Sequence, residues 1–475
     1  MILLMIAVFL IGYACIAMEH KLKIDKSAIA LVLCGVLWVI YIFAAPSLIP
    51  SAAGFSFKQF LADNPSVAAM PYLEQCIQFV VGHQLLDNLG ETAEILIFLI
   101  GAMTIVDLID SHGGFSFITE RITTRNERKL IWLIAGITFF MSALLDNMTT
   151  TIIMVMLLRK IIRNYKKRWI FAGVIIIAAN SGGAWSPIGD VTTIMLWVKG
   201  NVSTTPLIGS LLLPCLVSAL IPTAFAARML KPGEMAAAQS AVVSSRPRYI
   251  TKSDSLTILI LGVSLLVCVP VFKTVTHLPP FMGVTTALGI LWVYTELMYK
   301  HKRNMEESIK CRVSKVLKHI DMPTILFFLG ILMSVAVLQS AGILSSFASL
   351  LDTHVHNIYA INLMIGLLSA VVDNVPLVAA AMGMYPVMDT VSLAAAADPA
   401  YMQAFVQDGT FWHLLAYCAG VGGSMLIIGS AAGVVAMGLE KMNFMWYFKR
   451  ISLLAFMGYL AGAAVYVLQV FIGMA

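Results

Sequence analysis

The feature that most constrains this chain is a polar stretch, Ser142 to Thr151, that lies between two apolar runs. It reads Ser-Ala-Leu-Leu-Asp-Asn-Met-Thr-Thr-Thr, and neither neighbouring run, 130–145 or 152–158, is long enough to cross a bilayer alone. A carboxylate at such a depth costs roughly 3 kcal/mol or more, so it normally faces a protein interior or an aqueous cavity. The stretch therefore predicts the tip of a hairpin made of two half-spans.

The same arrangement occurs again later in the chain. Residues 369–382 read Ser-Ala-Val-Val-Asp-Asn-Val-Pro-Leu-Val-Ala-Ala-Ala-Met, so Asp373 and Asn374 follow Asp146 and Asn147 at a spacing of 373 − 146 = 227 residues. A duplicated Asp-Asn pair between half-spans is typical of membrane proteins built from two repeats.

Composition places the chain in the membrane. Of 475 residues, 60% are apolar and only 12% charged, which is too hydrophobic for a soluble domain and predicts a polytopic membrane protein. The first apolar run has no basic residue ahead of it and no clear cleavage site, so we expect a retained helix. The seven cysteines form no Cys-x-x-Cys pair, and the net charge of +6 fits basic cytoplasmic loops better than nucleic-acid binding.

Hydropathy predicts an all-α protein with about ten full spans and two re-entrant hairpins. The spans lie near 2–18, 28–49, 92–110, 170–198, 207–229, 256–274, 281–299, 323–340, 411–438 and 451–472, and the hairpins at 130–158 and 358–388. With both termini outside, all Lys and Arg residues except Lys58, Lys199 and Lys273 fall in cytoplasmic loops, as the positive-inside rule requires.

This topology gives two repeats that start from opposite faces of the membrane, which makes them inverted. We expect peripheral helices at 1–50 and an external loop or surface helix at 51–90. The first repeat follows at 91–230, linking helices and basic loops at 231–320, and the second repeat at 321–475.

One long span in each repeat is interrupted by glycines. The first break, residues 179–193, reads Ala-Asn-Ser-Gly-Gly-Ala-Trp-Ser-Pro-Ile-Gly-Asp-Val-Thr-Thr. The second, residues 420–433, reads Gly-Val-Gly-Gly-Ser-Met-Leu-Ile-Ile-Gly-Ser-Ala-Ala-Gly. Aligning the Gly-Gly pairs gives an offset of 423 − 183 = 240, under which Asp190 corresponds to Ser430. Helices broken at this depth survive only where protein or water satisfies the backbone, so we expect tips and breaks to meet near the midplane.

Such a place suits a small hard cation. Carboxylate, amide, hydroxyl and carbonyl oxygens can replace its hydration shell, and helix C-termini add negative dipole. Neither tip nor break contains Lys or Arg, which argues against a multiply charged anion as the main cargo. Half-helix N-termini can nevertheless hold anions, so that alternative stays open.

The tip Leu-Leu-Asp-Asn-Met-Thr-Thr-Thr, the first break and the tip Val-Asp-Asn-Val-Pro-Leu-Val-Ala-Ala strongly resemble NhaD-type sodium/proton antiporters of the ion transporter superfamily. The resemblance covers roughly residues 80–475. It implies a homodimeric exchanger of the bacterial inner membrane that extrudes Na⁺ or Li⁺ in return for H⁺ and needs no cofactor. It implies ion and proton handling by Asp146, Asn147, Asn180, Asp190, Thr192, Thr193, Asp373 and Asn374.

Other oxygen donors of the tips and breaks join this set as candidates. They are Thr149, Thr150, Ser424 and Ser430, and we assign Na⁺ contact to Asp146, Asn147, Asp190, Asp373 and Asn374. We expect Asp146 with Asp190 to exchange Na⁺ for H⁺ and Asp373 to bind a second ion. Candidates for pH sensing or a proton route are His83, Glu91, Glu94 and Asp107.

Each assignment has a structural alternative. Asp146, Asp373 and Asp190 can cap the helices that follow them, and Asn180 can satisfy broken backbone. The threonines, Thr151 included, can bond their own helix. At the level of function, the alternatives are a sodium-coupled dicarboxylate or arsenical permease of the same fold and, from another class, a membrane enzyme or channel. No nucleophile–base pair or metal motif supports an enzyme.

Overall fold

The computed structural model describes residues 1–115, 124, 126–230, 250–302, 310–394, 396 and 398–474. Every regular element in these residues is a helix. Among them, eight helices are long and apolar enough to cross a membrane. The predicted all-helical membrane protein is thus confirmed. The predicted cytoplasmic residues Arg121 and Arg125, and the basic segments 231–249 and 303–309, lie outside the described residues.

The chain divides into two compact units, each assembled from separate segments. The first unit combines Met1–Leu96, Asp321–Ile361 and Val375–Met388. The second combines Ile97–Ile320, Asn362–Asn374 and Asp389–Ala475. Both Asp-Asn pairs and both glycine breaks belong to the second unit.

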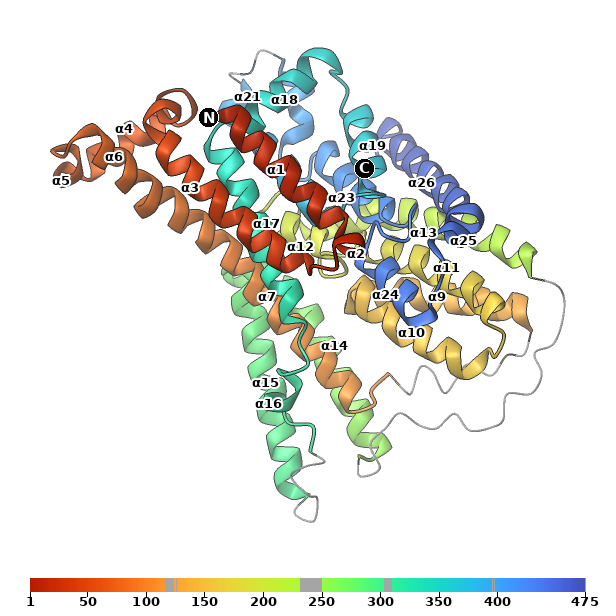
Figure 1. The fold of residues 1–475 in the computed structure, drawn as a ribbon. Helices are drawn as coiled ribbons and strands as arrows, with labels where there is room; N and C mark the ends of the chain where they lie inside the picture. The colour runs from red at the N-terminus through yellow and green to blue at the C-terminus, as the bar shows by residue number, and fades with distance from the viewer. Residues whose placement is uncertain are drawn as a thin grey trace. The chain divides into compact units, whose positions relative to one another are not determined.

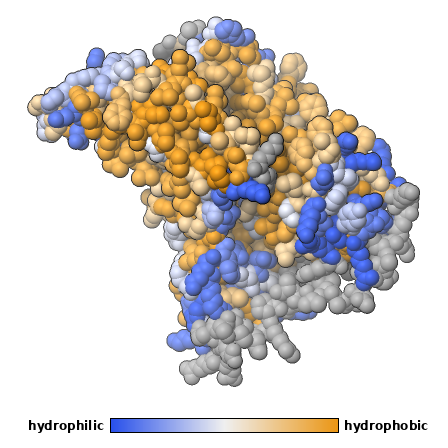
Figure 2. All heavy atoms as spheres, viewed as in Figure 1, coloured by the Kyte–Doolittle hydropathy of each residue, from blue (hydrophilic) through white to orange (hydrophobic). Residues whose placement is uncertain are grey.

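The first unit is built on α3 (Lys26–Ala52), which packs against α17 (Met322–Ser340) and α1 (Ile2–Ala17). At Gly330 a Cβ atom would lie only 2.6 Å from the carbonyl carbon of Ala30, so the backbones of α3 and α17 touch. The Tyr41 hydroxyl donates to Gln84 Oε1 and contacts the Ser340 carbonyl. Figure 2 shows apolar side chains over the visible face of α1 and α3, as expected for a surface in lipid.

Residues 51–90 are mostly helical. They form α4 (Gly54–Asp63), α5 (Pro65–Ala68) and α6 (Tyr72–Phe79), and a π-helical turn, Val80–Leu85, joins α6 to α7 (Leu86–Ser111). The helix predicted to begin near residue 92 therefore begins at Tyr72. The sequence analysis placed its start too late because Glu74, His83 and Asp87 lower the local hydropathy without ending the helix.

The second unit contains both tips, both breaks and the helices of the first hairpin, whereas residues 375–388 of the second hairpin belong to the first unit. α9 (Glu127–Leu145) and α10 (Asn147–Ile161) are separated by one residue. The first broken helix consists of α11 (Tyr165–Gly183) and α12 (Val191–Val198), and the second of α23 (Thr410–Gly422) and α24 (Ala431–Glu440). The second tip separates α19 (Ile358–Ser369) from α20 (Asn374–Met384).

Long helices support this centre. α13 (Thr204–Met229) packs along α26 (Leu453–Phe471), and α14 (Lys252–Thr276) along α15 (Pro280–His301) (Figure 1). Gly458 and Gly462 allow the first pair to approach closely, because a Cβ atom at either would lie within 2.5 Å of a carbonyl oxygen of α13. The remaining short helices are α2 (Glu19–Leu22), α16 (Val313–Val316), α18 (Ile343–His354), α21 (Thr390–Ala394), α22 (Pro399–Met402) and α25 (Phe444–Tyr447).

Candidate cation site

The first hairpin tip is a single residue, Asp146, between α9 and α10. Its backbone has φ 72° and ψ 160°, a conformation that residues other than glycine rarely adopt and that costs about 1–3 kcal/mol. Its Oδ1 accepts a hydrogen bond from the Thr149 amide at 2.8 Å, and its Oδ2 accepts one from the Thr149 hydroxyl at 2.9 Å. Asp146 therefore caps α10. The predicted capping contact is present, and it fixes the carboxylate at the tip.

Serine hydroxyls attach the first tip to the first break. Ser142 donates to the Ala179 carbonyl at 2.6 Å, and Ser186 donates to the Ala143 carbonyl at 2.6 Å. Gly182 permits the close approach, because a Cβ atom there would lie 2.1 Å from the carbonyl oxygen of Phe139. Two helices that lack part of their backbone hydrogen bonding are thus held against each other by backbone contact.

The second tip is attached to the second break in the same way. Ser369 donates to the Ala419 carbonyl at 2.8 Å, and a Cβ atom at Gly422 would lie 2.3 Å from the Gly366 carbonyl oxygen. Ser369 follows Ser142 by 369 − 142 = 227 residues, and Ala419 follows Ala179 by 419 − 179 = 240. These are the two offsets obtained from the sequence motifs.

Asn180 connects the first tip with the second break. Its Nδ2 donates to the hydroxyls of Ser424 and Ser430 at 3.0 and 2.9 Å, and its Oδ1 accepts from Asn147 Nδ2 at 3.2 Å. The side chain is fully buried. Satisfying broken backbone, the structural alternative for Asn180, is therefore not what its side chain does, since all three contacts are to other side chains.

Asp190 connects the first break with the second tip. Its Oδ2 accepts a hydrogen bond from Asn374 Nδ2 at 3.1 Å, and the residue is 2% exposed. Asp190 occupies the N-cap position of α12 but makes no side-chain capping hydrogen bond, whereas its counterpart Ser430 caps α24 through Gly433. The carboxylates of Asp146 and Asp373 lie close enough to Asp190 to interact with it electrostatically.

The threonines divide into two groups. The hydroxyls of Thr151 and Thr193 donate to the carbonyls of Asn147 and Asp190, both within one turn, which is the structural role. Thr150 is fully buried, and its hydroxyl has no hydrogen-bond partner among the described residues. Thr192 is also fully buried and follows Asp190 by two residues. Thr150 and Thr192 are therefore the threonines that best fit a ligand role.

The four candidates for pH sensing lie elsewhere in the chain. His83, Glu91 and Glu94 belong to the first unit, where the His83 ring stacks on Phe60 and its Nδ1 lies 2.5 Å from Asp87 Oδ2. Asp107 belongs to the second unit, where it lies 3.8 Å from His319 Nδ1. None of the hydrogen bonds described above between tips and breaks involves these four side chains.

The sequence analysis missed the anchoring serines. Ser142 and Ser369 each precede the tip aspartate by four residues, one helical turn, and a serine shared by both repeats at that position was a visible signal. Ser186 had no counterpart in the second break under the offset of 240, so only the structure reveals it.

Comparison with known proteins identifies the family. The profile of a family described as a citrate transporter matches residues 3–406. Sodium/proton antiporter 1 of Arabidopsis thaliana is 42% identical over 97% of this chain and 71% of its own length. The Na(+)/H(+) antiporters NhaD of Vibrio cholerae and Alkalimonas amylolytica are each 29% identical, over 91% and 97% of this chain and 84% and 89% of their own lengths.

The chain therefore belongs to this family of multi-pass membrane transporters. Within it, the predicted membership of the NhaD-type sodium/proton antiporter family is confirmed by the relatives that carry this name.

Adding a methyl group at the close glycines should destabilise the second unit. Gly182→Ala and Gly422→Ala each place a Cβ atom against a carbonyl oxygen, and we expect a loss of about 1–3 kcal/mol or more. The midpoint of thermal unfolding of the purified protein in detergent measures this loss. Gly136→Ala in α9 is the control, because its Cβ atom meets nothing within 4 Å. Equal midpoints for all three variants would contradict the backbone contacts.

Proposed function

We propose that this protein is a secondary active antiporter that exchanges Na⁺ or Li⁺ for H⁺ by alternating access. The observation that carries the proposal is the convergence of Asp146, Asp190 and Asp373 with the amides of Asn147, Asn180 and Asn374 in segments that contain no Lys or Arg. Oxygen-rich sites without a fixed positive charge suit a small hard cation. The names of the antiporter relatives support the same cargo.

In the proposed mechanism, cation and proton compete for the same carboxylates. Asp190 is buried near the Asp146 carboxylate, and two neighbouring carboxylates cannot both ionise cheaply, so a proton or a metal ion is needed between them. Na⁺ can replace the proton because Asp146, Asp190, the Asn180 oxygen and buried hydroxyls such as Thr150 offer it oxygen ligands. The Asp373 tip then binds the second ion. The proposal needs no cofactor; Na⁺ and H⁺ are the substrates.

Two inverted repeats and about ten spans are part of the proposal. The matched contacts of Ser142 with Ala179 and of Ser369 with Ala419, at the offsets of 227 and 240, support an internal duplication. In such a protein, alternating access can arise when the part that bears the hairpins moves relative to a scaffold. A homodimer and a location in the bacterial cytoplasmic membrane complete the proposal, although relatives come from plants as well as bacteria.

The alternative is a sodium-coupled anion permease. It is favoured by the description of the matching family as a citrate transporter. The N-termini of α10, α12 and α24 all begin at tips or breaks, and helix N-termini can hold a carboxylate. We rank this function second, because the site contributes three carboxylates that would repel the anion.

Transport by the purified protein in liposomes tests the proposal. Added Na⁺ should collapse an imposed pH gradient in the absence of any organic anion, with a rate that saturates in Na⁺. Repeating the measurement with valinomycin and K⁺ reports whether net charge moves. Proton flux that requires citrate or another dicarboxylate would establish the permease instead, and flux that does not saturate would indicate a channel.

Neutralising either tip should abolish or severely depress exchange. Asp146→Asn and Asp373→Asn each remove one cation ligand that can carry a proton, while Asn keeps the ability to cap a helix. Both variants should therefore fold and reach the membrane. Na⁺-driven proton flux, normalised to the amount of reconstituted protein, is the measurement. Wild-type rates in both variants would show that Asp146 and Asp373 only cap helices and do not take part in transport.

Asp190→Ser separates charge from helix geometry. The replacement copies the second repeat, where Ser430 occupies the equivalent position and caps its helix. Removing one carboxylate should raise the Na⁺ concentration for half-maximal rate about tenfold or more and flatten the pH dependence, because fewer coupled groups titrate. The Na⁺ half-saturation measured over a series of pH values provides the test. A variant indistinguishable from wild type would show that Asp190 has no part in the exchange.

A further inference from the structure

A group of hydrogen bonds and ion pairs, here called the tie, joins the C-terminal ends of α10 and α24 and contains a fully buried carboxylate. Glu440 is the last residue of α24, and its side chain is 0% exposed. A buried carboxylate is costly unless it is paired and hydrogen-bonded, so its partners define its role.

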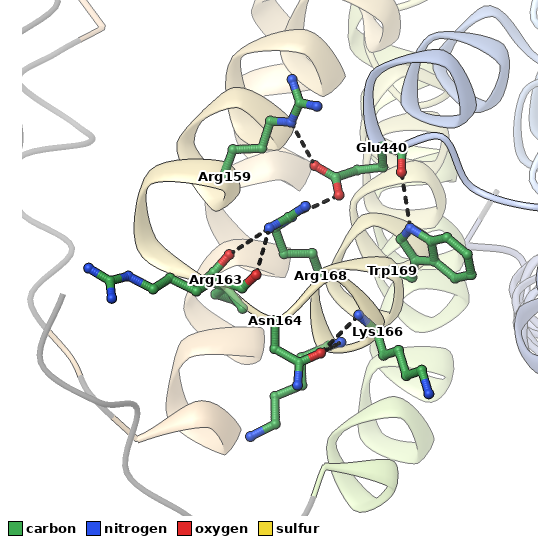
Figure 3. Close-up of polar contacts among 9 residues, drawn as sticks. Arg159, Arg163, Asn164, Lys166, Arg168, Trp169 and Glu440 are labelled. Carbon is green, nitrogen blue, oxygen red and sulfur yellow. Dashed lines mark hydrogen bonds and ion pairs between the residues drawn. The ribbon is translucent and has the colours of Figure 1, made fainter.

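The partners of Glu440 come from two places along the chain, the end of α10 and the start of α11 (Figure 3). Its Oε2 accepts from Arg168 Nε at 2.8 Å, and its Oε1 lies 3.2 Å from Arg159 Nε. Its own carbonyl accepts from Trp169 Nε1 at 3.1 Å. Arg168 also donates from Nη1 to the carbonyls of Ile162 and Arg163, directly after α10. One side chain therefore joins the end of α10, the start of α11 and the end of α24.

The same two helices begin at the candidate cation site. α10 starts with Asn147, and the residue before α24 is Ser430; both side chains hydrogen-bond to Asn180. α24 has ten residues, so its two ends lie about 15 Å apart. α10 and α24 pack side by side along this length (Figure 1). They are thus fixed to each other by Asn180 at one end and by Glu440 at the other.

We propose that Glu440 is a positioning residue for the cation site. By holding the C-terminal ends of α10 and α24 together, it keeps Asn147 and Ser430 at the spacing that Asn180 bridges. Arg159, Arg168 and Glu440 all belong to the same compact unit as the site, so a rigid movement of this unit would leave the tie intact. This inference rests on the proposed Na⁺/H⁺ exchange for its functional readout.

The chain supplies a matched control. Glu127 is another buried glutamate, 2% exposed, and it pairs with Lys167 Nζ. It joins α9 to α11, which are already held together by the contacts of Ser142 and Gly182. Loss of this pair should leave the spacing of α10 and α24 unchanged.

The experiment compares Glu440→Gln, Glu440→Asp and Glu127→Gln with wild type in liposomes. Glu440→Gln should raise the Na⁺ concentration for half-maximal rate about three- to tenfold. Glu440→Asp, which keeps the charge, should recover part of the difference, and Glu127→Gln should match wild type. A wild-type half-saturation in Glu440→Gln, or an equal shift in Glu127→Gln, would overturn the proposal.

The rate of amide hydrogen exchange, measured without Na⁺, tests whether Glu440 holds α10 and α24 together, and this test does not depend on which ion is transported. Amides of 431–440 and 147–161 should exchange faster in Glu440→Gln than in Glu127→Gln or wild type. If wild-type protein shows no Na⁺-driven proton flux, the proposed function is wrong. Faster amide hydrogen exchange in Glu440→Gln alone would even then support the structural role of Glu440. Unchanged exchange in Glu440→Gln would overturn it.

A cross-link distinguishes a lasting tie from a gate that opens in each cycle. Arg159→Cys with Glu440→Cys, bridged by a short bifunctional thiol reagent, should retain transport, with reagent-treated Arg159→Cys as the control for native cysteines. Loss of transport on bridging, with the control unaffected, would show that the two helices must separate and would overturn the positioning role.

Discussion

The structure depends on how a broken helix satisfies its backbone inside a membrane. Where α11 and α23 stop, carbonyl and amide groups lose their helical partners, and within a membrane each group left without a partner costs several kcal/mol. Ser186 of the first break meets part of this need, because it donates to the Ala143 carbonyl in the last turn of α9. Ser142 and Ser369 add hydrogen bonds to the Ala179 and Ala419 carbonyls, which lie within α11 and α23. Close glycine contacts make those hydrogen bonds reachable. Tip and break are therefore joined in each case by hydrogen bonds and by close backbone contact.

Side-chain amides then link the two halves across the centre. Asn180 connects the first tip to the second break, and Asn374 connects the second tip to Asp190 of the first break. Each contact joins segments far apart in sequence, by 250 residues in the case of Asn180 and Ser430. A displacement of one tip must therefore either break these hydrogen bonds or move the opposite break. Such coupling is what an exchanger needs if two ions are to share one conformational change.

The sequence predicted these local features well because they violate the ordinary rules of membrane helices. Asp146 and Asp373 in apolar runs, and glycines and a proline within spans, are improbable unless function requires them, so tips and breaks were located to within a few residues. The pairing of Asn180 with Ser424 and Ser430 was not predictable, because it depends on how two distant helices meet. The early start of the helix at Tyr72 was missed, since a polar helical turn resembles a loop in hydropathy.

The second unit also shows why two similar carboxylates have different surroundings. Asp146 lies at a one-residue tip, and its two carboxylate oxygens accept hydrogen bonds from the amide and the hydroxyl of Thr149. Fewer of their lone pairs are therefore available to bind a cation. Asp190 also lies at an N-cap position, but its side chain makes no capping hydrogen bond. Its Oδ2 accepts a hydrogen bond from Asn374 Nδ2. Ser430 in the other repeat does cap its helix. The two positions that correspond under the offset of 240 thus differ, because Ser430 caps its helix whereas the Asp190 carboxylate accepts a hydrogen bond from the second tip.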